Sequence, residues 1–60
     1  MEQNLFMGVD EVRAILKISR SAAYKIIREL NEELEKKGYM TIKGRISREY
    51  FAEKFYGFNK

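Results

Sequence analysis

The sequence contains no cysteine and no histidine among its 60 residues. Without cysteine it has no disulfide, no thiolate ligand for zinc and no thiol nucleophile, and the lack of disulfides favours a reducing, cytoplasmic setting. Without histidine as well, acid–base chemistry would fall to serine, lysine, tyrosine or carboxylates, and so short a chain rarely encloses a pocket that excludes water. We therefore expect a binding protein rather than an enzyme, with no cofactor and no bound metal.

Long hydrophobic runs are also missing, since no uninterrupted apolar stretch exceeds three residues. A helix that spans a bilayer needs about 20 such residues, so no membrane association is expected. Residues 1–4 lack the basic and apolar pattern of a signal peptide. No linker-like or repetitive segment divides the chain, so residues 1–60 are interpreted as one small domain.

Two helices are predicted in the first two thirds of the chain. The first, residues 9–17, follows Gly8 and places four apolar side chains on one face: Val9, Val12, Ile15 and Leu16. The second, residues 20–37, follows Ser19, a preferred N-cap, and ends at Gly38, a preferred C-terminal cap. The apolar face of this long helix comprises Ala23, Ile26, Ile27, Leu30 and Leu34.

A small β-hairpin is predicted after the long helix. Residues 39–42 alternate in polarity, and Lys43-Gly44 supplies a turn before a return strand at residues 45–46. Two registers are open at this point. A two-residue loop places Ile42 opposite Arg45, whereas a three-residue loop pairs Ile42 with Ile46. We favour the three-residue loop because both isoleucines then reach the core.

A short C-terminal helix, residues 48–56, completes the predicted fold. Ser47 is placed to cap its N-terminus, and Phe51 and Phe55 lie four residues apart on its buried face. Gly57 is expected to end this helix. The expected fold class is therefore mainly α with a small β-hairpin, in the order helix, turn, long helix, hairpin and C-terminal helix.

The net charge of +3 conceals a strong segregation of the basic residues. Residues 17–28 contain four basic and no acidic side chains, and residues 43–48 contain three more, again without an acid. These seven are Lys17, Arg20, Lys25, Arg28, Lys43, Arg45 and Arg48. The two segments together carry +7, so the other 42 residues carry −4. Basic patches on an acidic remainder indicate a surface for a polyanion.

The long helix also divides its charges between its two halves. At about 100° per residue, its N-terminal half presents a hydrogen-bonding face roughly opposite the apolar stripe. This face consists of Arg20, Ser21, Tyr24, Lys25 and Arg28. The C-terminal half is acidic, with Glu29, Glu32, Glu33 and Glu35. Such an arrangement is typical of a helix whose first half contacts DNA in the major groove.

Two stretches of the chain resemble the MerR-like winged helix-turn-helix and excisionase group. Residues 9–27 (VDEVRAILKISRSAAYKII) look like the opening helix, the turn with its serine and the DNA-reading helix of that group. Residues 44–51 (GRISREYF) look like its wing and following helix. The chain departs from the group in carrying Lys17 where glycine is usual, and in a second helix about two turns longer. It also lacks the coiled coil and effector domain of full MerR regulators, which implies a stand-alone DNA-binding factor.

The resemblance implies a winged helix-turn-helix fold and assigns roles to ten residues. The groove-facing positions of the recognition helix are matched by Arg20, Ser21, Tyr24, Lys25 and Arg28, and the wing tip by Lys43, Gly44 and Arg45. Ser19 and Arg48 stand at helix N-termini, where amides and positive charge suit a phosphate. Either Arg20 or Arg28 is a candidate to read guanine.

The expected function is sequence-preferring binding to double-stranded DNA, as a small transcriptional regulator or as an excisionase (a recombination directionality factor) of a mobile element. So small a module would gain affinity from further copies on adjacent sites, from a recombinase, or from the transcription or replication machinery. The alternative is a protein-interaction adaptor or antirepressor on the same scaffold, with the acidic stretch and exposed Tyr39 or Tyr50 as its surface. DNA binding requires Lys25 and Arg45 to lie on a common side of the molecule.

Overall fold

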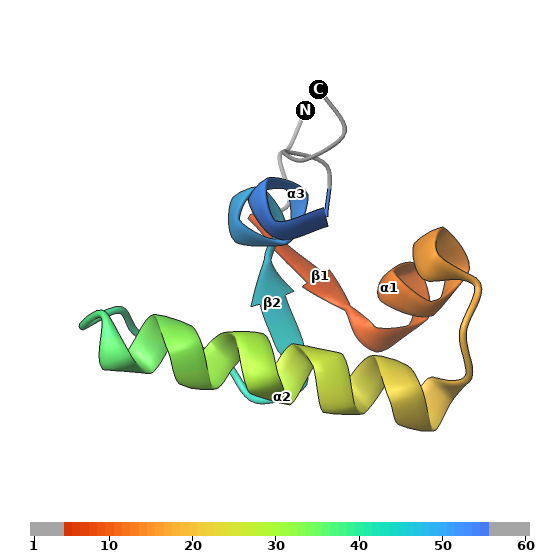
Figure 1. Cartoon of the computed structure of the whole chain (residues 1–60), viewed down its shortest axis with the longest axis horizontal. Helices are drawn as coiled ribbons and strands as arrows, with labels where there is room; N and C mark the ends of the chain where they lie inside the picture. Colours follow the sequence, from red (N-terminus) through yellow and green to blue (C-terminus); the bar gives the residue numbers. More distant parts are fainter. Residues whose placement is uncertain (1–4, 56–60) are drawn as a thin grey trace.

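The computed structural model describes residues 5–55, which form three helices and a two-stranded sheet (Figure 1). The elements follow in the order β1 (Phe6–Gly8), α1 (Val9–Leu16), α2 (Arg20–Lys36), β2 (Arg45–Ser47) and α3 (Arg48–Phe55). The long helix α2 runs along one side of the molecule, and the sheet, α1 and α3 lie above it in Figure 1. One face of α2 is therefore buried against the other elements, while much of its surface is open to solvent.

The two helices predicted at the start of the chain are present, and their predicted caps are confirmed. α1 begins after Gly8, whose backbone is extended. α2 begins after Ser19, whose hydroxyl oxygen accepts a hydrogen bond from the Ala22 N–H at 3.2 Å. At the other end of α2, Gly38 has a φ of +94°. The N–H groups of Gly38 and Tyr39 donate to carbonyls of the last turn, which is the Schellman arrangement that favours glycine.

The core lies between the helices and the sheet. Its most deeply buried large side chains are Met7, Val12, Ile27, Ile46 and Phe51. Most of the predicted apolar faces reach this core, and Ile26 of α2 is half-buried. Ile15 does not reach it, because it lies about 100° from Leu16 around α1, at the edge of the apolar face. With 39% of its surface exposed, Ile15 is the member of the predicted apolar face of α1 that stays outside the core.

The two-stranded antiparallel sheet is present, but its first strand is not the predicted one. β2 pairs with β1, so that Met7 lies opposite Ile46. Residues 39–42 form no strand and Ile42 is 46% exposed, so the favoured register and the burial of Ile42 are wrong. The physical reason is that the Ile42 carbonyl accepts a hydrogen bond from the Asn31 side chain at 3.3 Å. This bond holds the segment along α2 instead of in a ladder.

The C-terminal helix follows its predicted cap. The Ser47 hydroxyl oxygen accepts a hydrogen bond from the Tyr50 N–H at 3.3 Å. Phe51 is buried, and its ring centroid lies 4.7 Å from that of the half-buried Phe55. The predicted end of this helix, at residues 56–57, lies outside the described residues. None of the helices in the described part of the chain has the length and apolar character needed to cross a membrane.

Candidate nucleic-acid interface

A groove of about 760 Å³ runs between α2 and the loop that leads from α2 to β2. Its α2 wall includes Ser21, Tyr24, Lys25 and Arg28. The opposite wall includes Thr41, Lys43 and Gly44. Side chains from both basic segments of the sequence, residues 17–28 and residues 43–48, therefore line one cavity.

The turn that carries Lys43 and Gly44 is closed by its own backbone. The Arg45 N–H donates to the Ile42 carbonyl at 3.0 Å, which closes a β-turn around Lys43 and Gly44. Because residues 39–42 form no strand and Arg45 lies opposite Gly8, neither of the two predicted hairpin registers is formed. Gly44 has a φ of +78°, as the third position of a type II turn requires. A Cβ at this position would stand 4.0 Å from the ring of Tyr24. Glycine thus permits the turn to adopt a left-handed residue close to α2.

Asn31 was not predicted as a functional residue, yet it connects the two walls of the groove. It is the one polar side chain that is buried among the described residues, with 8% of its surface exposed. Its Nδ2 donates to the carbonyl oxygens of Arg45 at 2.8 Å and Ile42 at 3.3 Å. The sequence did contain a signal, because a weak helix former stands in the interior of the longest helix between Leu30 and Leu34.

A shallower hollow adjoins the groove and extends the same surface. Its lining includes Arg20, Tyr24, Gly44 and Arg45, together with the start of α1. Tyr24 and Gly44 line both hollows, so Lys25 and Arg45 border one continuous surface. The geometric requirement of the DNA-binding hypothesis, that Lys25 and Arg45 lie on a common side, is therefore met.

Two of the predicted contact residues are already held by carboxylates of α1. Arg20 Nη1 lies 3.0 Å from Asp10 Oδ1, and the guanidinium carbon is 6.0 Å from the centre of the Tyr24 ring. Arg48 makes a bidentate pair with Glu11, with N–O distances of 2.9 and 3.3 Å. The Arg48 pair joins the beginning of α3 to α1. A phosphate contact by Arg48 stays a prediction, because the guanidinium has this intramolecular role in the free protein.

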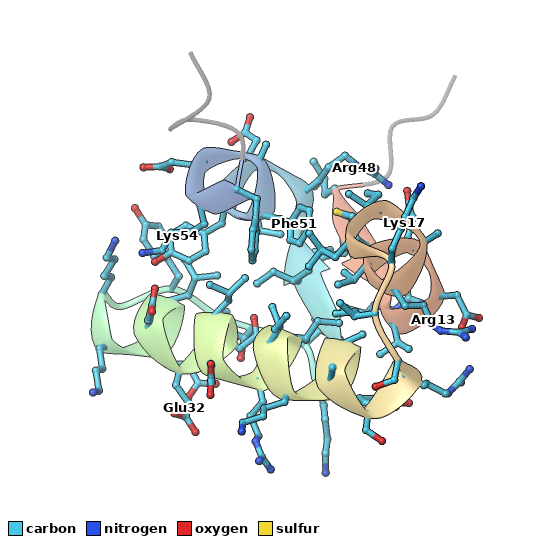
Figure 2. The ribbon with its side chains drawn as sticks, turned by 45° about the vertical axis from the view of Figure 1, so that its right-hand side comes forward. Arg13, Lys17, Glu32, Arg48, Phe51 and Lys54 are labelled. Atoms are coloured by element: carbon cyan, nitrogen blue, oxygen red, sulfur yellow. The ribbon has the colours of Figure 1, made fainter. Side chains whose placement is uncertain are left out.

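Lys17 and Ser19, in the turn between α1 and α2, do not line the groove. Lys17 is the left-handed C-cap of α1, with a φ of 57°, which is the conformation that glycine adopts most readily. Figure 2 shows the Lys17 side chain pointing away from α2. The Ser19 hydroxyl is occupied by its capping bond to the Ala22 N–H. Lys17 thus belongs to a basic segment of the sequence but not to the groove.

Four basic side chains remain exposed around the groove and the adjoining hollow. They are Lys25, Arg28, Lys43 and Arg45, and are called the groove cations below. None of them forms an ion pair with any residue that the structure describes. This surface therefore offers four unneutralised positive charges to an anionic ligand.

Carboxylates bound the groove at its other end. Glu32 and Glu35 line the groove beyond Arg28, and Figure 2 shows Glu32 on the outer side of α2. Glu35 Oε2 accepts a hydrogen bond from the Thr41 hydroxyl at 2.5 Å. The positive charge is therefore confined to the part of the groove nearer the start of α2, as the charge pattern of the sequence predicted.

Another part of the acidic stretch is engaged within the molecule. Glu33 Oε1 accepts a hydrogen bond from the Tyr50 hydroxyl at 2.6 Å and lies 3.2 Å from Lys54 Nζ. The Tyr50 hydrogen bond, followed by that of Lys54, lowers the pKa of Glu33, and the same carboxylate raises the pKa of Lys54. Tyr50 is 8% exposed, so its expected exposure is wrong, whereas Tyr39 is 62% exposed.

Comparison with known proteins identifies a relative of this chain. No family model matches the sequence, and no solved structure matches it. The chain is similar to the ICEBs1 excisionase of Bacillus subtilis (strain 168), with 38% identity over 48 residues. The aligned region covers 80% of this chain and 75% of that protein, so the similarity extends through most of both. The protein therefore belongs to the excisionase family.

Proposed function

We propose that this protein is a sequence-preferring double-stranded DNA-binding protein that acts as a recombination directionality factor of a mobile element. The observation that carries the proposal is the continuous surface between α2 and residues 43–45, where the four groove cations have no acidic partner among the described residues. The similarity to an excisionase supports it independently. The proposed scaffold is a MerR-like winged helix-turn-helix in which residues 43–45 act as the wing.

In the proposed complex, the N-terminal half of α2 enters the major groove, and the wing lies on the adjacent backbone or in the minor groove. Ser21 and Tyr24 then face the DNA, and a direct contact to guanine comes from Arg20 or Arg28. Such a bidentate contact is worth about 1–3 kcal/mol of discrimination. The phosphate contacts that neutralise backbone charge are assigned to the four groove cations, and the five N–H donors of Arg28 allow it to contact a phosphate as well as a base. Ser19, Gly44 and Arg48 are further proposed backbone contacts, and the charge of Arg48 is already balanced by Glu11.

One module of this size covers a single groove segment, so we propose that partners supply further affinity. Additional copies on adjacent sites would place the acidic part of one α2, including Glu29 and Glu32, near the basic surface of the next copy. A recombinase, or the transcription or replication machinery, is the proposed protein partner. Cooperative laddering in a gel-shift titration is expected for adjacent copies, and independent complexes at each site would contradict them.

A protein-interaction adaptor or antirepressor is the second candidate function. The observation that favours it is the pair Tyr39 and Met40, which follow each other in the loop and are 62% and 92% exposed. Neighbouring exposed apolar side chains are typical of a protein contact. Under this hypothesis the groove cations make no contribution to binding, so substitutions there separate the two candidates.

Charge reversal in the groove tests the proposal against a matched control. Arg28→Glu reverses a charge in the groove wall, and Lys36→Glu makes the same change at the exposed C-terminal end of α2. We expect Arg28→Glu to weaken binding to a labelled duplex by about tenfold or more in fluorescence anisotropy, because it loses a phosphate contact. Lys36→Glu is expected to change binding by less than about twofold, since screening limits distant charges to about 10 Å.

Two results of this experiment would contradict the proposal. Equal losses of duplex affinity in Arg28→Glu and Lys36→Glu would show that binding depends on net charge rather than on the groove. A folded wild-type protein that binds no duplex at low salt would show that the surface serves another ligand. Circular dichroism of each variant confirms that the helices are retained in the comparison.

A further inference from the structure

Asn31 lies where the loop from α2 to β2 crosses the helix. On one side of this crossing it lines the groove, with Lys43 and Gly44. On the other side it lines a second hollow, with Tyr39 and Met40. Asn31 is therefore a residue of α2 that borders both hollows beside the loop.

The Asn31 side chain holds both ends of the turn. Its NH₂ group has two hydrogens, and it donates to the carbonyl of Arg45 at 2.8 Å and of Ile42 at 3.3 Å. The Ile42 carbonyl also accepts the Arg45 N–H at 3.0 Å, so side-chain and backbone bonds form one network. A buried amide without partners costs free energy, so the conformation of Asn31 is favourable only while the turn is docked on α2.

Other anchors hold the ends of the loop but not its centre. At the start, the Tyr39 N–H donates to the Leu34 carbonyl at 3.0 Å, and at the end β2 pairs with β1. Between these points Met40, Ile42 and Lys43 are exposed. The bond from Thr41 to Glu35 is open to solvent and is therefore weak. An apolar residue at position 31 would suit the core but would leave the turn without its central anchor.

We infer that Asn31 is a positioning residue that fixes the distance of Lys43 from Lys25 and Arg28, so that all three contact one DNA duplex. The inference rests on the proposed function. Asn31 acts through the backbone of the turn and makes no DNA contact itself. When the turn is released, Lys43 samples many positions and its phosphate contact is lost. One such contact corresponds to about eightfold in affinity at 0.1 M salt, from a slope of about 0.9 per contact.

A double-mutant cycle on duplex binding tests this inference. Asn31→Leu removes both donors, and Lys43→Ala removes the cation. In the wild-type background, Lys43→Ala is expected to weaken binding about eightfold and to reduce the log–log salt slope by about 0.9. In the Asn31→Leu background it is expected to have almost no effect, because the contact is already lost. Arg28→Ala is the control, and we expect about an eightfold loss in both backgrounds.

Two patterns in the cycle would overturn the inference. A full eightfold effect of Lys43→Ala in the Asn31→Leu background would show that the turn is positioned without Asn31. Effects of Lys43→Ala and Arg28→Ala that shrink together would show that Asn31→Leu disturbs the whole domain rather than the turn. The salt slope distinguishes these cases from a simple loss of folded protein, which lowers the apparent affinity without changing the slope.

Amide hydrogen exchange of the free protein separates this inference from the proposed function. In Asn31→Leu, we expect the Arg45 amide to exchange at least about tenfold faster, because its hydrogen bond to Ile42 is no longer supported. The Tyr39 amide, bonded to Leu34 in the helix cap, is the control and keeps its protection. An Arg45 amide that stays protected overturns the inference even if the wild type binds DNA. Accelerated exchange together with no duplex binding by the wild type overturns the proposed function instead.

Discussion

The four groove cations determine how strongly salt weakens DNA binding in this account. The two basic segments contain seven basic residues, but three of them either pair with a carboxylate or lie away from the groove. Arg20 is paired with Asp10, and Arg48 is paired with Glu11. Lys17 points away from α2 (Figure 2). Four contacts at about 0.9 each predict a log–log salt slope of about −3.6, whereas seven contacts would give about −6.

Fluorescence anisotropy of a labelled duplex measures this slope between 50 and 200 mM sodium chloride. A slope of about −3.6 corresponds to a loss of affinity of about 150-fold across that range, and a slope of about −6 to several thousandfold. Lys25→Ala is expected to reduce the magnitude of the slope by about 0.9, since Lys25 lines the groove and has no partner among the described residues. Lys17→Ala is the matched control and is expected to leave the slope unchanged.

A wild-type slope near −6 would refute the reasoning, because it would require Arg20, Arg48 and Lys17 to release counterions as well. A slope near zero would also refute the reasoning, because it would show that the groove cations make no contact with DNA phosphates. Equal effects of Lys17→Ala and Lys25→Ala would show that position around the groove does not matter.

Three further predictions concern stability. Lys17→Gly is expected to raise the free energy of unfolding by about 0.5–1 kcal/mol in urea titration, because glycine adopts the φ of 57° without the steric cost to lysine; a lower value would contradict this strain. The pKa of Glu33 is lowered by Tyr50 and Lys54, so its contribution is present above the ordinary glutamate pKa and is lost as pH falls through the lowered one. The melting temperature of Glu33→Gln should therefore fall less than that of the wild type on acidification, and parallel falls would contradict the assignment. Phe51→Ala is expected to cost about 3–5 kcal/mol, close to the whole stability of so small a domain, so circular dichroism should show substantial unfolding at 25 °C; a fully cooperative native signal would count against the assigned core.

The helices were predictable because their determinants are local. The 3.6-residue spacing of apolar side chains, the Ser19 cap and the left-handed Gly38 all act within a few residues, and each is present in the structure. The Ser47 cap of α3 was found for the same reason. Charge segregation along the chain likewise predicted a cationic surface on the first half of α2, since helix geometry fixes which side chains share a face.

The parts that were not predicted depend on contacts between distant segments. β2 pairs with β1, which precedes it by more than thirty residues in sequence, and each strand has only three residues, too few for a periodic signal. Arg20 and Arg48 pair with carboxylates of α1, which are also tertiary contacts. A count of basic residues in the sequence is therefore larger than the number of cations that are unpaired and open to DNA. Asn31 was missed because its partners are backbone carbonyls of a loop whose path the sequence pattern did not indicate.

The central claim is that the groove face of the protein lies against DNA. Cleavage of the DNA by an iron chelate tethered to the protein tests this claim most directly. The chain has no cysteine, so Ser21→Cys in the groove wall and Glu53→Cys on α3 each carry an iron chelate at one defined position. We predict strong cleavage of a bound duplex from the chelate at position 21 and little from the chelate at position 53. Cleavage from position 53 that equals or exceeds cleavage from position 21 would contradict the account.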